Sequence, residues 1–146
     1  MEAKTWILVA NASHAKLYQR QHTLQVPEYL RSWEHEESRK HVEDLIADSA
    51  AGRSQQSFAH GARPAIDPKT SPKLVVKEHF AAELGHYLNQ ERKAGTFAEI
   101  ILVALPEFLG LLREALDKDM ANCVTKSVAK DYTESHSEEL QKHLEA

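Results

Sequence analysis

Three features are scarce or missing in this sequence of 146 residues, and each absence narrows the class of protein. Its single cysteine, Cys123, excludes an internal disulfide and fits a reducing compartment. No apolar run approaches the roughly 20 residues of a membrane-spanning helix, and the run at residues 6–10 is too short for an export signal. The formal net charge of -4 argues against a general nucleic-acid binder with a uniformly basic surface. We therefore expect a cytoplasmic protein with no membrane partner.

Common signatures of catalytic and cofactor sites are missing as well. The sequence contains no G-x-S-x-G nucleophile elbow, no G-x-x-x-x-G-K-[ST] phosphate loop and no G-x-G-x-x-G dinucleotide motif. It has neither an H-E-x-x-H motif nor a pair of cysteines, which are frequent sources of zinc ligands. These absences favour a protein that is not an enzyme and that uses no cofactor.

The strongest positive signal is the stretch at residues 99–105, which is apolar without a break after Glu99 and is followed by Pro106. Its length, its β-branched residues and the proline that stops it are typical of a strand buried on both faces. Pro106 suits the first position of a following helix, because its missing N–H would have no partner there. A strand covered on both faces needs helices above and below it, so this run predicts a layered α/β domain.

Three shorter runs precede it and predict an antiparallel meander, at residues 6–10, 15–20 and 24–33. The second run alternates, and its two faces are Ala15, Leu17 and Gln19 against Lys16, Tyr18 and Arg20. Leu24 and Val26 lead the third run. Pro27 assigns that part to a sheet edge or a bulge, because proline cannot donate a hydrogen bond to a neighbouring strand.

The chain after residue 73 predicts three helices and a last strand. A helix at residues 74–94 has an apolar stripe, made by Val76, Phe80, Leu84, Tyr87 and Leu88. Gly95 follows where a left-handed residue is expected to end it. We expect a second helix at residues 106–116, burying Phe108, Leu109, Leu112 and Leu116. A final strand is expected at residues 123–129, with an inner face made by Val124 and Val128. A closing helix follows it, and an S-x-x-E capping box at Ser135 and Glu138 marks where that helix begins.

The order of these elements predicts how the sheet is arranged. Strand–helix–strand connections are parallel and right-handed in nearly all proteins, so the strand at residues 99–105 lies beside the first strand in the middle of the sheet. We therefore predict a single α/β domain with a five-stranded mixed sheet of order 3-2-1-4-5 and helices on both faces. That order is the ribonuclease-H-like arrangement.

Residues 34–48 are strongly charged and predict a short helix or loop, and the chain then changes character. The stretch at about 49–73 has no apolar period, and we expect it to be a long mobile loop. Its one acidic residue, Asp67, is opposed by four basic residues, a local charge of +3: Arg53, Arg63, Lys69 and Lys73. These four and His60 are the candidate binding residues, for phosphates or for an acidic protein surface. The alternative is a solvated loop whose charge is incidental.

Other polar clusters have simpler explanations. Three residues along one flank of the helix at 74–94 have a spacing that a metal site could use, but a solvated flank is favoured: His79, Glu83 and His86. Four carboxylates would suit a metal-dependent nuclease only if they gathered at one sheet edge, and surface positions are favoured: Asp44, Asp48, Asp67 and Asp131. Cys123 is interpreted as a small buried hydrophobic residue rather than a nucleophile.

With these residues identified, the chain resembles the bacterial host-attachment family, described as proteins required for attachment to host cells. The resemblance covers about residues 6–144. It is carried by WILVANASHAKLY, EESRKHVEDLIADSAAGR, DPKTSPKLVVKEHFAAELGHYL and FAEIILVALPEFLGLLREAL, and the ending KDYTESHSEELQKHL also fits. The helix FLGLLREAL and the Gly-Arg at the entry of the basic loop are the most specific pieces.

That family is similar to a wider group related to the middle domain of the eukaryotic and archaeal class-1 release factor, which implies the same ribonuclease-H-like fold. In that factor a Gly-Gly-Gln tripeptide in the corresponding loop promotes peptidyl-tRNA hydrolysis. The loop here has Gln55, Gln56 and Gly61 but no Gly-Gly-Gln, so peptide release is not expected. The resemblance implies a non-enzymatic protein that binds RNA, a ribosome or a protein through the basic loop, with any part in attachment exerted indirectly from inside the cell. A metal-dependent nuclease is a third, disfavoured hypothesis.

Overall fold

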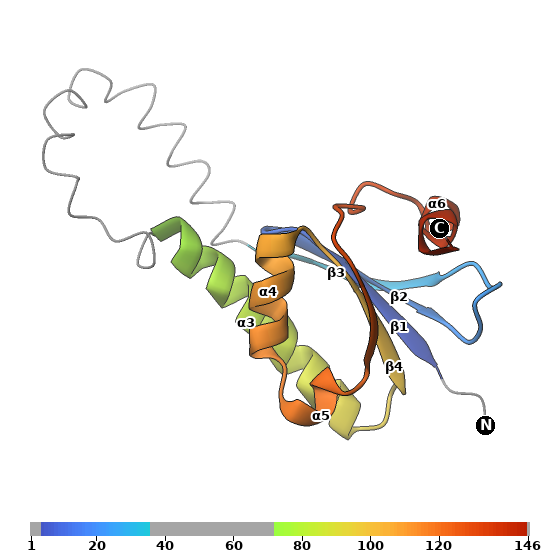
Figure 1. Cartoon of the computed structure of the whole chain (residues 1–146), viewed down its shortest axis with the longest axis horizontal. Coiled ribbons are helices and arrows are strands. Elements are labelled where there is room, and N and C mark those ends of the chain that lie inside the picture. The colour runs from blue at the N-terminus through green and yellow to red at the C-terminus, as the bar shows by residue number, and fades with distance from the viewer. Residues whose placement is uncertain (1–3, 36–71, 146) are drawn as a thin grey trace, which may run out of the picture.

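The computed structural model describes residues 4–35 and 72–145, in which helices cover both faces of a five-stranded sheet (Figure 1). The strands are β1 (Thr5–Ala10), β2 (His14–Arg20), β3 (Glu28–Glu34), β4 (Glu99–Val103) and β5 (Val124–Val128). The helices are α3 (Pro72–Lys93), α4 (Pro106–Ala115), α5 (Lys118–Ala121) and α6 (Ser137–Glu145). The strand order β3-β2-β1-β4-β5 confirms the predicted sheet.

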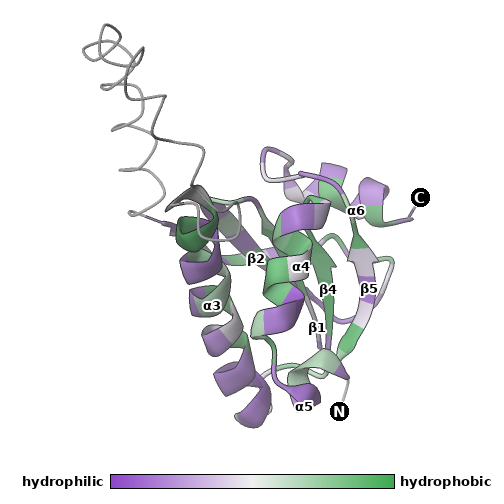
Figure 2. Cartoon of the chain, turned by 60° about the vertical axis from the view of Figure 1, so that its left-hand side comes forward, coloured by the Kyte–Doolittle hydropathy of each residue, from purple (hydrophilic) through white to green (hydrophobic). Residues whose placement is uncertain are grey.

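The two central strands are apolar on both faces because each of them is covered twice. β1 runs antiparallel to β2 and parallel to β4, which in turn runs parallel to β5. Leu8 and Leu102 belong to the larger core cluster, which α3 and α4 cover. Ile7 and Ile101 belong to the second cluster, which α6 covers. Figure 2 shows this as apolar strands lying behind helices with polar outer surfaces.

The larger core cluster lies between the sheet and the layer formed by α3 and α4. Phe80, Leu84 and Leu88 are at most 1% exposed, which confirms the predicted stripe of α3. α3 ends at Lys93, and Gly95 follows two residues later with a φ of 75°, the left-handed conformation that glycine adopts without strain. No helix within the described ranges is long and apolar enough to cross a membrane.

α6 forms the opposite layer, and it is too short to cover the whole face. Its nine residues span about 13.5 Å at 1.5 Å per residue, and it buries Leu140 and Leu144 against the sheet. Its start differs from the predicted capping box by one residue. The Glu139 carboxylate accepts a hydrogen bond from the backbone N–H of His136 at 3.3 Å, so the reciprocal positions are 136 and 139 rather than 135 and 138.

Two predictions about the outer strands are wrong in detail. β3 begins at Glu28, after Pro27, because residues 21–25 form a turn closed by the hydrogen bond from Gln25 N–H to the His22 carbonyl at 3.1 Å. Leu24, which was expected to lead this strand, is instead 78% exposed.

The inner face predicted for β5 is also wrong. Ile100 pairs with Val124 and Ile101 with Lys126, so a bulge at Thr125 shifts the alternation. Val124 therefore packs against the larger core cluster and Val128 against the second one.

Candidate functional site

The predicted basic segment lies largely outside the described residues. Arg53, His60, Arg63 and Lys69 fall in residues 36–71, which the structure does not describe. Lys73 belongs to the first turn of α3. Asp44, Asp48 and Asp67 of the hypothetical nuclease site also lie outside the described ranges. The basic segment therefore remains a prediction from the sequence.

Three rings pack together after β3, between α3 and α4, and we call them the aromatic corner: His35, Phe80 and Phe108. The backbone N–H of His35 donates to the Ser13 carbonyl at 2.8 Å. The His35 ring stacks on Phe80 with ring centres 4.8 Å apart, and Phe80 in turn contacts Phe108 of α4 at 5.7 Å. Pro72 begins α3 eight residues before Phe80, a distance of about 12 Å along a helix.

The other polar residues that the sequence singled out are described only in part. His79, Glu83 and His86 are exposed on α3, and the described ranges contain no group of three His, Cys, Asp or Glu side chains able to hold a metal ion. Asp131 caps its own turn, because its Oδ1 accepts from the backbone N–H of Thr133 at 3.0 Å and from the Thr133 hydroxyl at 2.6 Å.

Cys123 packs as a small buried residue at the head of β5. It is 8% exposed and belongs to the larger core cluster. Its Sγ accepts a hydrogen bond from Nε of Arg92 at 2.7 Å and lies 3.4 Å from the Asp119 carbonyl, to which it donates. These contacts place the thiol between α3 and α5, in agreement with the predicted structural role.

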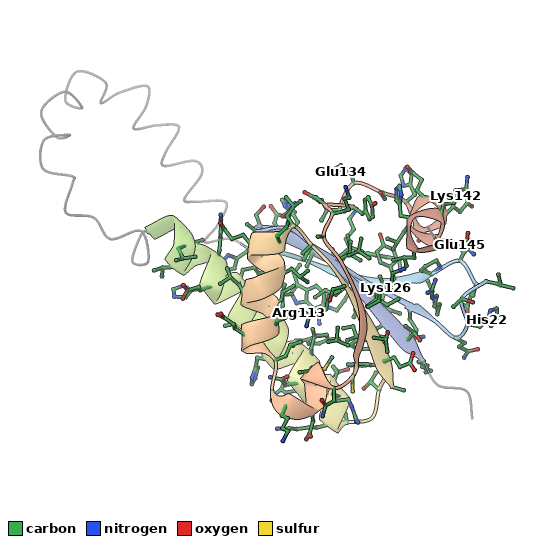
Figure 3. All side chains as sticks on the ribbon, viewed as in Figure 1. His22, Arg113, Lys126, Glu134, Lys142 and Glu145 are labelled. Atoms are coloured by element: carbon green, nitrogen blue, oxygen red, sulfur yellow. The ribbon has the colours of Figure 1, made fainter. Side chains whose placement is uncertain are left out.

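A polar cavity of about 560 Å³ opens where α6 leaves the sheet uncovered. Four of its lining side chains, one from each of four neighbouring strands, lie on the α6 face of the sheet: Arg20, Thr5, Glu99 and Lys126. His22, Thr23 and Thr125 add polar groups from the β2–β3 connection and the β5 bulge. In Figure 3 the labelled His22, Lys126 and Glu145 come from that connection, β5 and α6. We call this the end-of-sheet cavity.

Arg20 is the unusual residue of the end-of-sheet cavity. It is only 6% exposed, and its Nη1 has no hydrogen-bond partner among the described residues. Burial lowers the pKa of the guanidinium, and the nearby carboxylate of Glu145 opposes this shift. A buried unpaired donor costs about 1–3 kcal/mol, and more for a charged group.

Lys126 faces the same cavity from β5. Its Nζ donates to the Leu144 carbonyl at the end of α6 at 2.8 Å, which also places a positive charge at the negative end of the helix dipole. An ammonium has three donors, so this hydrogen bond occupies only one of them.

Sequence reasoning missed this cavity as a site, although one signal for it was present. The alternation of β2 correctly places Arg20 on the face of Tyr18, which is buried and belongs to the second core cluster. An arginine in line with a buried apolar face is unusual. Lys126 gave no such signal, because the bulge at Thr125 sets the face that it occupies.

Comparisons with known proteins match nearly the whole chain. A family model described as "Protein required for attachment to host cells" matches residues 6–144. Among solved structures, one described as an archaeal protein aligns with a TM-score of 0.49 and 12% sequence identity, covering 95% of this chain and 33% of its own. The chain therefore spans about a third of the length of that protein. No curated protein sequence matches it.

Proposed function

The chain belongs to the family of proteins required for attachment to host cells, and from that membership we propose that it is a non-enzymatic cytoplasmic protein that binds a macromolecule. The observation that carries this proposal is the charge of residues 49–73, which is +3 in a chain of net charge -4. A concentration of one sign of charge in a single segment is a recurrent feature of surfaces that bind an oppositely charged partner.

The second candidate is a narrower form of the first, in which the partner is RNA or a ribosome. Phosphates are the acceptors that Arg and Lys side chains most often contact in nucleic acids. The resemblance to the release-factor middle domain favours a ribosomal setting. The absence of a Gly-Gly-Gln tripeptide argues for contact without peptide release. A part in attachment would then be indirect and exerted inside the cell.

The test is capture of partners from cell lysate by the full chain at low and high salt. We expect a variant with four changes, Arg53→Ala, Arg63→Ala, Lys69→Ala and Lys73→Ala, to lose the captured partner, because it removes the charges proposed to make the contact. If the partner is RNA, neutralising up to four phosphate contacts gives a logarithmic salt slope of about -3 for single strands. Sequencing the bound RNA and mass spectrometry of the bound proteins separate the two candidates.

A matched control removes the same charge from other elements. Lys93, Lys118, Lys130 and Lys142 are all exposed, and changing all four to alanine should leave capture intact. The proposal fails if both variants lose the partner equally, since net charge alone would then explain binding. It also fails if the basic-segment variant captures as much as the unmodified chain.

A further inference from the structure

We propose that the end-of-sheet cavity binds a small anionic ligand through a phosphate or carboxylate group. This site is separate from the basic segment, because its side chains come from the sheet strands, the β2–β3 connection and α6. A volume of about 560 Å³ lies within the roughly 300–1,000 Å³ of small-molecule sites. The cavity therefore suits a small metabolite rather than a chain of nucleotides.

The unpaired Nη1 of the Arg20 guanidinium is the observation that points to an anion. Arg20 is 6% exposed, lines the cavity and has a nitrogen with no hydrogen-bond partner among the described residues. Buried polar groups in native proteins are almost always paired, and an exception indicates a missing partner. The planar fork of arginine matches the oxygens of phosphate and carboxylate groups, so an oxyanion is the partner that fits.

The other wall of the cavity adds donors of the same kind. Lys126 keeps two ammonium donors after its hydrogen bond to the Leu144 carbonyl. Thr5, Thr23 and Thr125 contribute hydroxyl groups that can donate to the same oxygens. A negatively charged ligand held between Arg20 and Lys126 would have a positive charge on each side of it.

The cavity also contains acidic groups, which restrict the ligand. Glu99 lines it, and Glu145 lies near enough to Arg20 to influence its charge. Arg20 and Lys126 balance these two carboxylates, so the cavity has little net charge to offset several negative charges on one ligand. Glu99 can instead accept hydrogen bonds from hydroxyl groups of the ligand. The chemistry fits a small phosphate ester or a hydroxy acid with one anionic group.

The test is an NMR titration of the ¹⁵N-labelled full chain with sodium phosphate and, separately, sodium lactate, with ionic strength held constant by sodium chloride. We expect saturable shifts confined to the amides that line the cavity, at Gln21, Thr23, Thr125 and Lys126. Saturation by either anion supports the site, and the anion that binds more tightly identifies the class. Shifts that do not saturate, or that spread over lysines across the whole surface, would overturn it.

Variants at the cavity make the test specific. Lys126→Met should weaken binding by about tenfold or more, because it removes a charged donor, and Lys126 is exposed enough for the variant to fold. Glu99→Gln should tighten binding by about threefold, since it removes a repelling charge near the surface. Lys130→Met, which lies outside the lining, is the matched control and should bind as the unmodified chain does.

Arg20→Met is the decisive variant. It should abolish binding, and its amide spectrum shows whether the domain still folds. If it does not fold, unchanged affinity in Lys126→Met is enough to reject the site. The variant with four changes in the basic segment should bind both anions normally, so failure here and failure of the proposed macromolecular binding are distinguishable.

Discussion

Replacing Gly85 by alanine is expected to lower the free energy of unfolding by about 2 kcal/mol, although alanine is the better helix former. A Cβ at this position of α3 would lie 2.6 Å from the Cβ and 2.8 Å from the carbonyl oxygen of Ala115 in α4. Two of the three nearest atoms belong to the backbone, so α3 and α4 must separate to admit it. Overpacking costs about 1–3 kcal/mol and occasionally more, and this exceeds the gain of about 1 kcal/mol in helix propensity.

Gly110 provides the matched control for this change. It lies within α4, and a Cβ there would meet no atom within 4 Å. Gly110→Ala should therefore stabilise the protein by about 0.5–1 kcal/mol. Urea unfolding followed by circular dichroism measures both values, and equal m-values would show that the unfolded states are comparable. Two shifts of the same sign would contradict the close approach of α3 and α4.

The parts of the fold that the sequence predicted are those where one local signal outweighs the rest. β1 and β4 read as continuous apolar runs because helices cover both of their faces. The start of α4 is marked by a proline and the end of α3 by a glycine at φ 75°. Once these elements are placed, the handedness of strand–helix–strand connections leaves few sheet orders.

The errors arose where pairing partners, rather than local sequence, decide the structure. The face of the sheet on which each β5 residue lies depends on a bulge in the pairing with β4. No residue type in residues 123–129 predicts that bulge. The start of β3 depends on whether a turn or a strand takes residues 21–25, and Pro27 removes the donor that would have extended the strand. The four-residue helix α5 was missed because it is too short to show a period.

The end-of-sheet cavity was beyond prediction for a related reason. Its charged residues, Arg20, Glu99 and Lys126, come from three strands that are far apart in the sequence. Glu99 and Lys126 look like ordinary surface residues when their own strands are considered alone, and only Arg20 lies in line with a buried apolar face. They form one surface because their strands lie side by side with β1 in the sheet, and the neighbours of a strand are a tertiary property. The basic segment was easier to propose because its residues are neighbours in the chain.

Replacing Phe80 by alanine is expected to have the largest effect on stability, about 3–5 kcal/mol. Phe80 is fully buried at the aromatic corner, where it links α3 to α4 and to the residue that follows β3. Its ring stacks on His35 after β3 and contacts Phe108 of α4. The change therefore leaves a cavity and also removes the ring that holds His35. Thermal and urea unfolding measure the loss, and Val75→Ala in the same helix, where the side chain is 37% exposed, should shift stability by no more than about 0.5 kcal/mol.

Phe80→Leu separates the two consequences of that change. Leucine fills more of the space than alanine, so it should cost less stability than Phe80→Ala, but it cannot stack on His35. The hydrogen bond from His35 N–H to the Ser13 carbonyl should then open more often, so the His35 amide should exchange with deuterium faster in Phe80→Leu. The Asn11 amide, which donates to the His14 carbonyl within the neighbouring turn, provides the internal reference. Equal protection of His35 in Phe80→Leu and the unmodified chain would mean that the stack does not anchor the end of β3.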